Sequence, residues 1–307
     1  MRALLVDPGS PARLRLGDAP DPVPAAGQAL IEVRHSSLNA AELFFAGTSE
    51  PGTVLGFDAA GVVVAAAADG TGPGAGSRVV SFAGRGGWAE LRAVDTADLA
   101  VVPDDVDLAA AATLPVAGGT ALRALWQAGA TAGRRVLVTG ASGGVGSFVV
   151  QLAALGGAHV IASVGSPERG EGLDRLGATH VVVGLDGVDE PVDIVIDQVG
   201  GPQMVDAYRL LAPGGTLQSV GWASGQPAAF PPGSTLGSPA PKSIVSVYNG
   251  SGLADRHPQL TALLDLLAAG KLTVQIGWRG SWEQVADAAQ ALSTRRLAGK
   301  AVLDIVH

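Results

Sequence analysis

The chain contains no cysteine, so disulfide bonds and thiolate metal sites are excluded. Histidine is also scarce, and its five copies show no metal-ligand spacing. They are His35, His159, His180, His257 and His307. Each is interpreted as a surface or strand-end residue, and no metal site is predicted.

Long apolar runs and a basic surplus are missing too. No run approaches the ~20 uninterrupted apolar residues of a membrane-spanning helix, so no membrane contact is expected. The formal net charge of −8 argues against a nucleic-acid partner. The opening residues 1–6 lead directly into Asp7-Pro-Gly, without the apolar core and cleavage site of a signal peptide. With 307 residues and 47% apolar content, enough for about two domains, the chain is expected to be a cytoplasmic enzyme.

Glycine, in contrast, is abundant, with 44 residues, and its most informative cluster follows a short apolar strand at 136–139. The spacing of Gly140, Gly143 and Gly146 suits a tight turn, a close approach of backbone to phosphate, and tight packing of helix on strand. A phosphate then lies at the helix N-terminus, where N–H groups and the helix dipole favour an anion. The prediction is a dinucleotide site, with a glycine-rich turn that binds no ligand as the alternative. Its residues are Gly140, Ser142, Gly143, Gly144, Val145 and Gly146.

Short apolar strands and helices alternate after this turn. Strands are predicted over 159–164, 180–183, 192–197 and 216–220, with helices over 167–176 and 203–211. This alternation is typical of an α/β fold with a doubly wound parallel sheet covered by helices. The first third has short strands and turns rich in glycine instead, which indicates a small β-rich domain. Residues after 271 find no place in the parallel sheet and are expected to return to that domain.

Seven short motifs follow one another in an order that resembles the medium-chain dehydrogenase/reductase superfamily, and within it the zinc-free quinone oxidoreductase-like (zeta-crystallin-like) enzymes. Besides the glycine turn, they begin at Ser36 (SSLN), Leu55 (LGFDAAG), Gly74 (GAGSRV), Gly86 (GGWAEL), Leu114 (LPVAGGTA) and Ala298 (AGKAVL). The resemblance implies a Rossmann sheet, residues 111–271, inserted into a GroES-like β-rich catalytic domain, residues 1–110 and 272–307. It also implies an active site in the cleft between the domains, and a homodimer paired through the last sheet strand near 244–247.

The same comparison indicates chemistry without zinc. Zinc alcohol dehydrogenases carry Gly-His-Glu where this chain has Gly56-Phe57-Asp58, and phenylalanine cannot ligate a metal. Without that Lewis acid, positioning and hydrogen bonding must drive hydride transfer, which suits a quinone or a C=C bond conjugated to a carbonyl. The predicted function is NADPH-dependent reduction of such a small apolar substrate. A zinc-free alcohol or sugar dehydrogenase, and a catalytically inactive or regulatory NADPH-binding protein, are the alternatives.

The cofactor preference depends on the end of the second predicted strand of the parallel sheet. An acidic residue there would hold the ribose of NAD and repel the 2′-phosphate of NADP, but residues 163–165 are uncharged. Ser166 and Arg169 can bind a phosphate instead, although Glu168 lies between them. NADPH is therefore the predicted cofactor, and a capped helix start is the other interpretation of this segment. Further predicted cofactor contacts are Thr120, Ser163, Gly165, Val220 and Gly221.

Two residues are candidates for catalysis. The resemblance matches Asn39 to an asparagine near the nicotinamide and the substrate carbonyl, where an amide can donate without a change of charge; a turn-forming role is the alternative. Tyr248 follows the last strand of the sheet, at the edge where ligands of this fold bind, and can donate a proton. Many quinone oxidoreductases carry a Tyr/Arg-bearing loop after the asparagine. This chain has Glu42 as a shifted acid and Phe44-Phe45 instead, which favours a hydrophobic enone.

Overall fold

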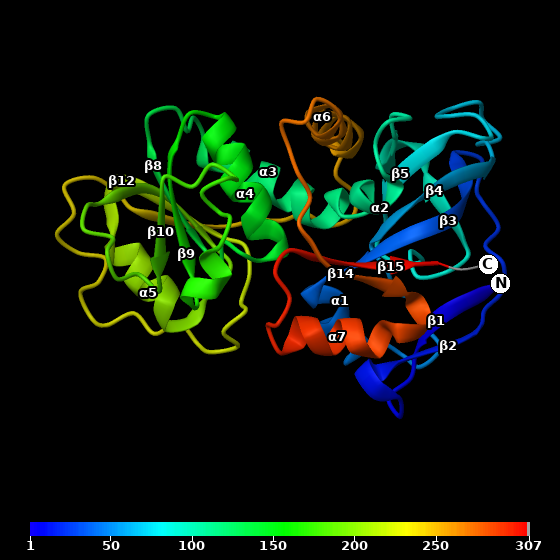
Figure 1. Ribbon diagram of the computed structural model, residues 1–307, viewed down its shortest axis with the longest axis horizontal. Helices are drawn as coiled ribbons and strands as arrows, with labels where there is room; N and C mark the ends of the chain where they lie inside the picture. The colour runs from blue at the N-terminus through cyan, green and yellow to red at the C-terminus, as the bar shows by residue number, and fades with distance from the viewer. Residues whose placement is uncertain (306–307) are drawn as a thin grey trace. The chain divides into compact units, whose positions relative to one another are not determined.

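The computed structural model describes residues 1–305, which form two compact units (Figure 1). The first unit comprises residues 1–119 and the chain from 250 onward, and the second comprises residues 120–249. The end of the predicted catalytic segment 272–307, with His307, lies outside the described residues. Among residues 1–305, no helix is long and apolar enough to cross a membrane.

The second unit is built on a six-stranded sheet in which every neighbouring pair is parallel. Its strands are β8 (Arg135–Thr139), β9 (His159–Val164), β10 (His180–Val183), β11 (Val192–Asp197), β12 (Leu211–Ser219) and β13 (Ser243–Ser246). The accompanying helices are α3 (Gly119–Ala128), α4 (Gly144–Leu155) and α5 (Gly201–Arg209). In the spatial order β10-β9-β8-β11-β12-β13, the chain winds outward from β8, returns, and winds outward on the other side. This confirms the predicted doubly wound α/β sheet.

One predicted helix of this unit is mostly absent. Residues 167–176 form only a short 3-10 helix, Pro167–Gly170, followed by turns. Gly172 adopts a φ of +79°, outside the helical region, and glycine weakens a helix because its backbone loses the most freedom on folding. The helix prediction is therefore wrong beyond residue 170.

The first unit contains a seven-stranded, mostly antiparallel sheet and a hairpin of β1 (Arg2–Val6) and β2 (Leu14–Asp18). The sheet strands are β3 (Gln28–Leu38), β4 (Asp58–Ala65), β5 (Arg78–Phe82), β6 (Leu91–Asp95), β7 (Leu99–Val101), β14 (Ile276–Ser281) and β15 (Lys300–Asp304). The helices are α1 (Ala40–Ala46), α2 (Leu108–Ala111), α6 (Arg256–Ala268), α7 (Val285–Ser293), a π-helical turn at Leu114–Gly118, and 3-10 helices at Pro11–Arg13, Thr96–Asp98 and Trp282–Gln284. Two fully buried tryptophans, Trp88 and Trp282, belong to one of its hydrophobic cores.

The unit boundaries differ from the predicted boundaries at 110 and 271. Residues 111–119 and 250–271 belong to the first unit. Helix α6 packs against β7, and a hydrogen bond of 2.7 Å joins His257 Nδ1 to the Leu99 carbonyl oxygen. The apolar pattern of α6 identifies a helix, but such a pattern does not specify which of two sheets the helix covers.

Candidate functional site

The glycine turn between β8 and α4 has the backbone geometry of a phosphate site. Gly140 adopts a φ of +63°, which residues with a side chain rarely do. A Cβ atom on Gly146 would lie 2.3 Å from the Gly140 carbonyl oxygen, so only glycine allows this close approach. Gly143 directly precedes α4, whose first N–H groups have no partners within the helix. The turn therefore fits a diphosphate held by the backbone of residues 143–146.

The structure brings Arg169 to this turn. Arg169 Nε donates a hydrogen bond of 3.1 Å to Ser142 Oγ, which places a guanidinium group beside the glycine turn. Ser166 forms a hydrogen bond that lowers the pKa of the exposed Glu168, so the Ser166 hydroxyl already has an acceptor. A Cβ atom added to Gly165 would meet no neighbouring atom within 4 Å. Of the residues after β9, Arg169 is thus the strongest candidate for a phosphate contact.

Ser163 is a predicted cofactor contact whose side chain is already used inside the unit. The residue is fully buried, and its Oγ donates to the Gly184 carbonyl oxygen at 2.5 Å. The same oxygen accepts a hydrogen bond of 3.1 Å from Gln203 Nε2. The hydroxyl therefore fixes the end of β9, and the cofactor contact predicted for Ser163 stays a prediction.

Asp197, which no motif marks, ties together the carboxyl ends of three strands. Its Oδ1 accepts from Thr139 Oγ1 at 2.5 Å, and its Oδ2 accepts from the Gly200 N–H at 2.9 Å. The N–H groups of Val220 and Gly221 donate to its carbonyl oxygen at 2.8 and 3.2 Å. Burial raises the pKa of Asp197. These bonds fix β8, β11 and β12 at the sheet edge that carries the glycine turn. The only sequence signal for this role is an acidic residue at the end of an apolar strand.

Thr120 and Tyr248 lie on adjoining segments although 128 positions separate them in the numbering. Asn249 Nδ2 donates to Thr120 Oγ1 at 3.0 Å, and Arg123 Nε donates to the Tyr248 carbonyl oxygen at 3.0 Å. The Tyr248 side chain is 62% exposed. The start of α3 and the residues after β13 therefore form one surface of the second unit.

Asn39 is the centre of a buried polar group in the first unit. Its Nδ2 donates to Glu42 Oε2 at 3.1 Å and to Asp58 Oδ2 at 2.9 Å, while its Oδ1 accepts from Lys300 Nζ. Asn39, Glu42, Asp58 and Lys300 are named the acid–lysine cluster below. Because an amide carries two hydrogens, this arrangement leaves Asn39 none for a substrate carbonyl. The two amide hydrogens are used inside the cluster, and the catalytic role that the resemblance implies for Asn39 stays a prediction.

The cluster joins α1, β4 and β15 of the first unit. Glu42 on α1 accepts from the N–H groups of Asn39, at 2.7 Å, and of Phe57. Asp58 at the start of β4 accepts from Ser37 and, at 2.9 Å, from the Val116 N–H. Lys300 Nζ on β15 lies 3.8 Å from Asp58 Oδ2. Burial, and then the charge of Asp58, raise the pKa of Glu42 to about 8, whereas burial lowers the pKa of Lys300.

Glu42 is expected to make the protein less stable as the pH rises. Its folded-state pKa of about 8 exceeds the ordinary 4.5, so the folded chain keeps a proton that the unfolded chain has released. The free energy of unfolding therefore falls as the pH rises from 4.5 to about 8, by at most about 1.4 kcal/mol per pH unit. Urea unfolding across this pH range should show a slope that Glu42→Gln removes and that Glu50→Gln, an exposed control, retains. Equal slopes in all three proteins would contradict the pKa assigned to Glu42.

The environment of residue 57 does not fit a catalytic zinc ion. Phe57 occupies the position of the zinc-binding histidine in zinc alcohol dehydrogenases, and the neighbouring carboxylates Glu42 and Asp58 are held in the acid–lysine cluster. Residues 1–305 contain no group of three or more His, Cys, Asp or Glu side chains that could hold a metal ion. Four-coordinate sites need such a group.

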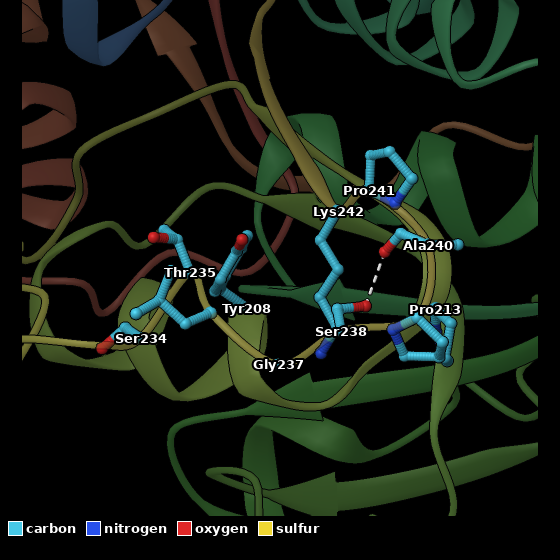
Figure 2. A pocket seen from close by; sticks show the side chains of 11 residues that line it. Tyr208, Pro213, Ser234, Thr235, Gly237, Ser238, Ala240, Pro241 and Lys242 are labelled. Atoms are coloured by element: carbon cyan, nitrogen blue, oxygen red, sulfur yellow. Dashed lines mark hydrogen bonds between the residues drawn. The ribbon is translucent and has the colours of Figure 1, made fainter.

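A cavity of about 590 Å³ lies elsewhere on the second unit (Figure 2). It is lined by Tyr208, Pro213 and residues 234–242. Pro213 lies near the start of β12, and Lys242 directly precedes β13, so the cavity lies at the amino ends of these strands. The glycine turn follows the carboxyl end of β8, so it lies at the other end of the strands of the parallel sheet. The cavity is therefore separate from the candidate cofactor site.

Two family models match the chain. The alcohol dehydrogenase GroES-like domain matches residues 25–104, and the zinc-binding dehydrogenase model matches residues 144–269. The chain is 32% identical over 270 residues to quinone oxidoreductase-like protein 2 of Bos taurus, covering 81% of this chain and 76% of the relative. It is 32% identical over 298 residues to 2-methylene-furan-3-one reductase of Solanum lycopersicum, covering 90% of this chain and 71% of the relative.

Solved structures agree over the whole length. A mycobacterial protein in complex with NADPH has 28% identity and a TM-score of 0.89, covering 99% of this chain and 100% of the other. The quinone oxidoreductase of Coxiella burnetii has 26% identity and a TM-score of 0.86, covering 100% and 99%. The fold and the matched proteins define an oxidoreductase with a GroES-like domain and a Rossmann domain for a nicotinamide cofactor. The chain belongs to the medium-chain dehydrogenase/reductase family, and the relatives it matches include quinone oxidoreductase-like proteins.

Proposed function

We propose that the protein transfers hydride from NADPH to a quinone or an α,β-unsaturated carbonyl compound without zinc. The observation that carries this proposal is the environment of Phe57. The Phe57 side chain cannot ligate a metal, and its acidic neighbours Glu42 and Asp58 are held by hydrogen bonds. A substrate reduced without a metal must already contain an electron-poor carbon, as these compounds do. The printed names of two relatives, a quinone oxidoreductase-like protein and a 2-methylene-furan-3-one reductase, support the same class.

The residues of the second unit would bind the cofactor. The glycine turn would hold the diphosphate, Arg169 the 2′-phosphate, and Thr120 the nicotinamide end. When bound, reduced nicotinamide supplies the hydride. With an α,β-unsaturated carbonyl compound, the hydride would add to the carbon β to the carbonyl, and the α carbon would take a proton, for which the exposed Tyr248 is the proposed donor.

Arg169→Glu is expected to weaken NADPH binding by about 10- to 100-fold, because it replaces a charged hydrogen bond to phosphate with repulsion. NADH lacks the 2′-phosphate, so its binding should change little. Equilibrium titration of both nucleotides, followed by nicotinamide fluorescence, measures the two effects.

A matched control is Arg134→Glu, which makes the same change of charge at an exposed site before β8, at the opposite end of that strand from the glycine turn. This variant should bind both nucleotides like the unchanged protein. If Arg169→Glu also left NADPH binding unchanged, Arg169 would have no role at the 2′-phosphate.

The site of hydride addition tests the reaction itself. With NADPH deuterated at C4 of the nicotinamide and 2-cyclohexen-1-one as acceptor, the saturated ketone should carry deuterium on the carbon β to the carbonyl. Deuterium on the carbonyl carbon would show an alcohol dehydrogenase instead. NADPH binding without product would favour the regulatory alternative.

We also propose a homodimer. Strand β13 is at the edge of the parallel sheet, with β12 as its one paired strand among the described residues. Its Ile244 is 44% exposed, and an exposed sheet edge is a ready surface for pairing with a second copy.

A further inference from the structure

Four of the six phenylalanine rings of this chain lie in a row in the first unit. Phe44 and Phe45 on α1 meet edge to face at 5.8 Å between ring centroids, and Phe45 meets Phe57 in the same way at 6.0 Å. Phe57 in turn lies 6.0 Å from Phe82, with a tilt of 39°. These four residues are named the phenylalanine row below.

The two ends of the row differ in exposure. Phe82 is 3% exposed, and the guanidinium group of the buried Arg256 stacks 3.9 Å from its ring centroid. At the other end, Phe44 is 69% and Phe45 is 43% exposed. Their neighbour Leu43 packs against a hydrophobic core of the first unit instead, so α1 presents its two aromatic residues to solvent. Only 4% of this chain is aromatic, which makes two adjacent exposed rings on one short helix a feature that needs an explanation.

Phe57 in the middle of the row is held rigidly through its backbone. Its N–H group donates to Glu42. Its carbonyl oxygen accepts from the buried Arg92 Nη2 at 2.8 Å and from the Ala83 N–H at 3.0 Å. Two buried side chains, Glu42 and Arg92, therefore fix the position from which the Phe57 ring extends. A surface that is rigid before the ligand arrives loses little entropy when it binds.

We propose that the part of the phenylalanine row that reaches the surface, Phe44, Phe45 and Phe57, is a substrate-specificity surface. It favours flat, conjugated ring compounds, such as quinones and aryl or cyclic enones, over straight-chain 2-alkenals. The inference rests on the proposed reductase function, because it names the substrate class of that reaction. The faces of phenylalanine rings are electron-rich, and a quinone ring is electron-poor, so the two attract when they stack. A straight-chain alkenal offers no ring face for such stacking.

Phe45→Leu and Phe57→Leu test the row, because leucine keeps the site apolar but removes the ring. We expect each to lower kcat/KM for 1,4-naphthoquinone by about tenfold. For trans-2-hexenal, kcat/KM should change by less than about twofold, because a chain without a ring has no stacking to lose. Phe45→Tyr keeps the ring and should restore the preference. Phe230→Leu is the matched control, since Phe230 packs edge to face on Tyr208 in the second unit. Equal losses for both acceptors in the two leucine variants would overturn the proposal.

Binding without turnover separates this proposal from the reductase function. Calorimetry of 1,4-naphthoquinone with cofactor-free protein needs no reaction, and the chain has no cysteine that the quinone could modify. Affinity that falls about tenfold in Phe45→Leu supports the row, even if the protein oxidises no NADPH and the reductase proposal fails. Absence of binding to the unchanged protein overturns the row even if reductase activity is found. So does an affinity in both leucine variants that equals that of the unchanged protein.

Discussion

Replacing Lys300 by methionine is expected to lower the free energy of unfolding by about 3–5 kcal/mol, the usual cost of leaving a buried charge without its partner. Lys300 is 3% exposed and is the cation of the acid–lysine cluster, where it contacts Asn39 and lies 3.8 Å from Asp58. Methionine is similar in length but offers no charge to the buried Asp58 carboxylate. Urea unfolding near neutral pH, with the Lys300→Met variant against the unchanged chain, measures the loss.

Lys271→Met is the matched control, because Lys271 is exposed. Its free energy of unfolding should stay within about 0.5 kcal/mol of the unchanged protein. A double variant, Lys300→Met with Asp58→Asn, should lose less than the two single losses together, because the pair interacts directly. If Lys300→Met unfolded like the Lys271→Met control, the cluster would contribute nothing to stability.

Gly146→Ala is expected to weaken NADPH binding by about 10- to 100-fold, since an added methyl in a packed site costs about 1–3 kcal/mol. The new Cβ would lie 2.3 Å from the Gly140 carbonyl oxygen and 2.7 Å from Ala141 Cα. Both are backbone atoms, so relief requires the start of α4 to move away from the turn. That movement would displace the N–H groups that are proposed to hold the diphosphate. Fluorescence titration with NADPH measures the change.

Gly74→Ala provides the comparison for Gly146→Ala. An added Cβ at Gly74 meets no atom within 4 Å, and Gly74 belongs to the first unit. NADPH affinity should therefore be unchanged in this variant. Unaltered affinity in Gly146→Ala as well would show that close packing of α4 on the turn is not needed for the nucleotide.

The doubly wound sheet was predictable from sequence because its signals are local. Each strand is a short apolar run, and the glycine spacing identifies the turn after β8 without reference to any other segment. The placement of α6 was not predictable, because an apolar helix face does not specify its partner. The helix prediction for residues 167–176 is wrong for another reason, because Gly170 and Gly172 outweigh the apolar periodicity around them.

The candidate site was predictable only in part, because its contacts join distant segments. Arg169 and Ser142 were both predicted as cofactor contacts, but their hydrogen bond appears only in the fold. The resemblance marks Asn39, whereas its hydrogen-bond partner Lys300 is 261 positions away. Pairing over such separations leaves no trace in the composition of either segment.

The central claim is tested most directly by NADPH and NADH oxidation against quinones, cyclic enones, 2-alkenals and simple ketones, with a metal chelator present. The expected result is oxidation of NADPH in preference to NADH by quinones or enones, at a rate that the chelator does not change. Activity restricted to simple ketones, or activity that the chelator abolishes, would contradict a zinc-independent reductase of conjugated substrates.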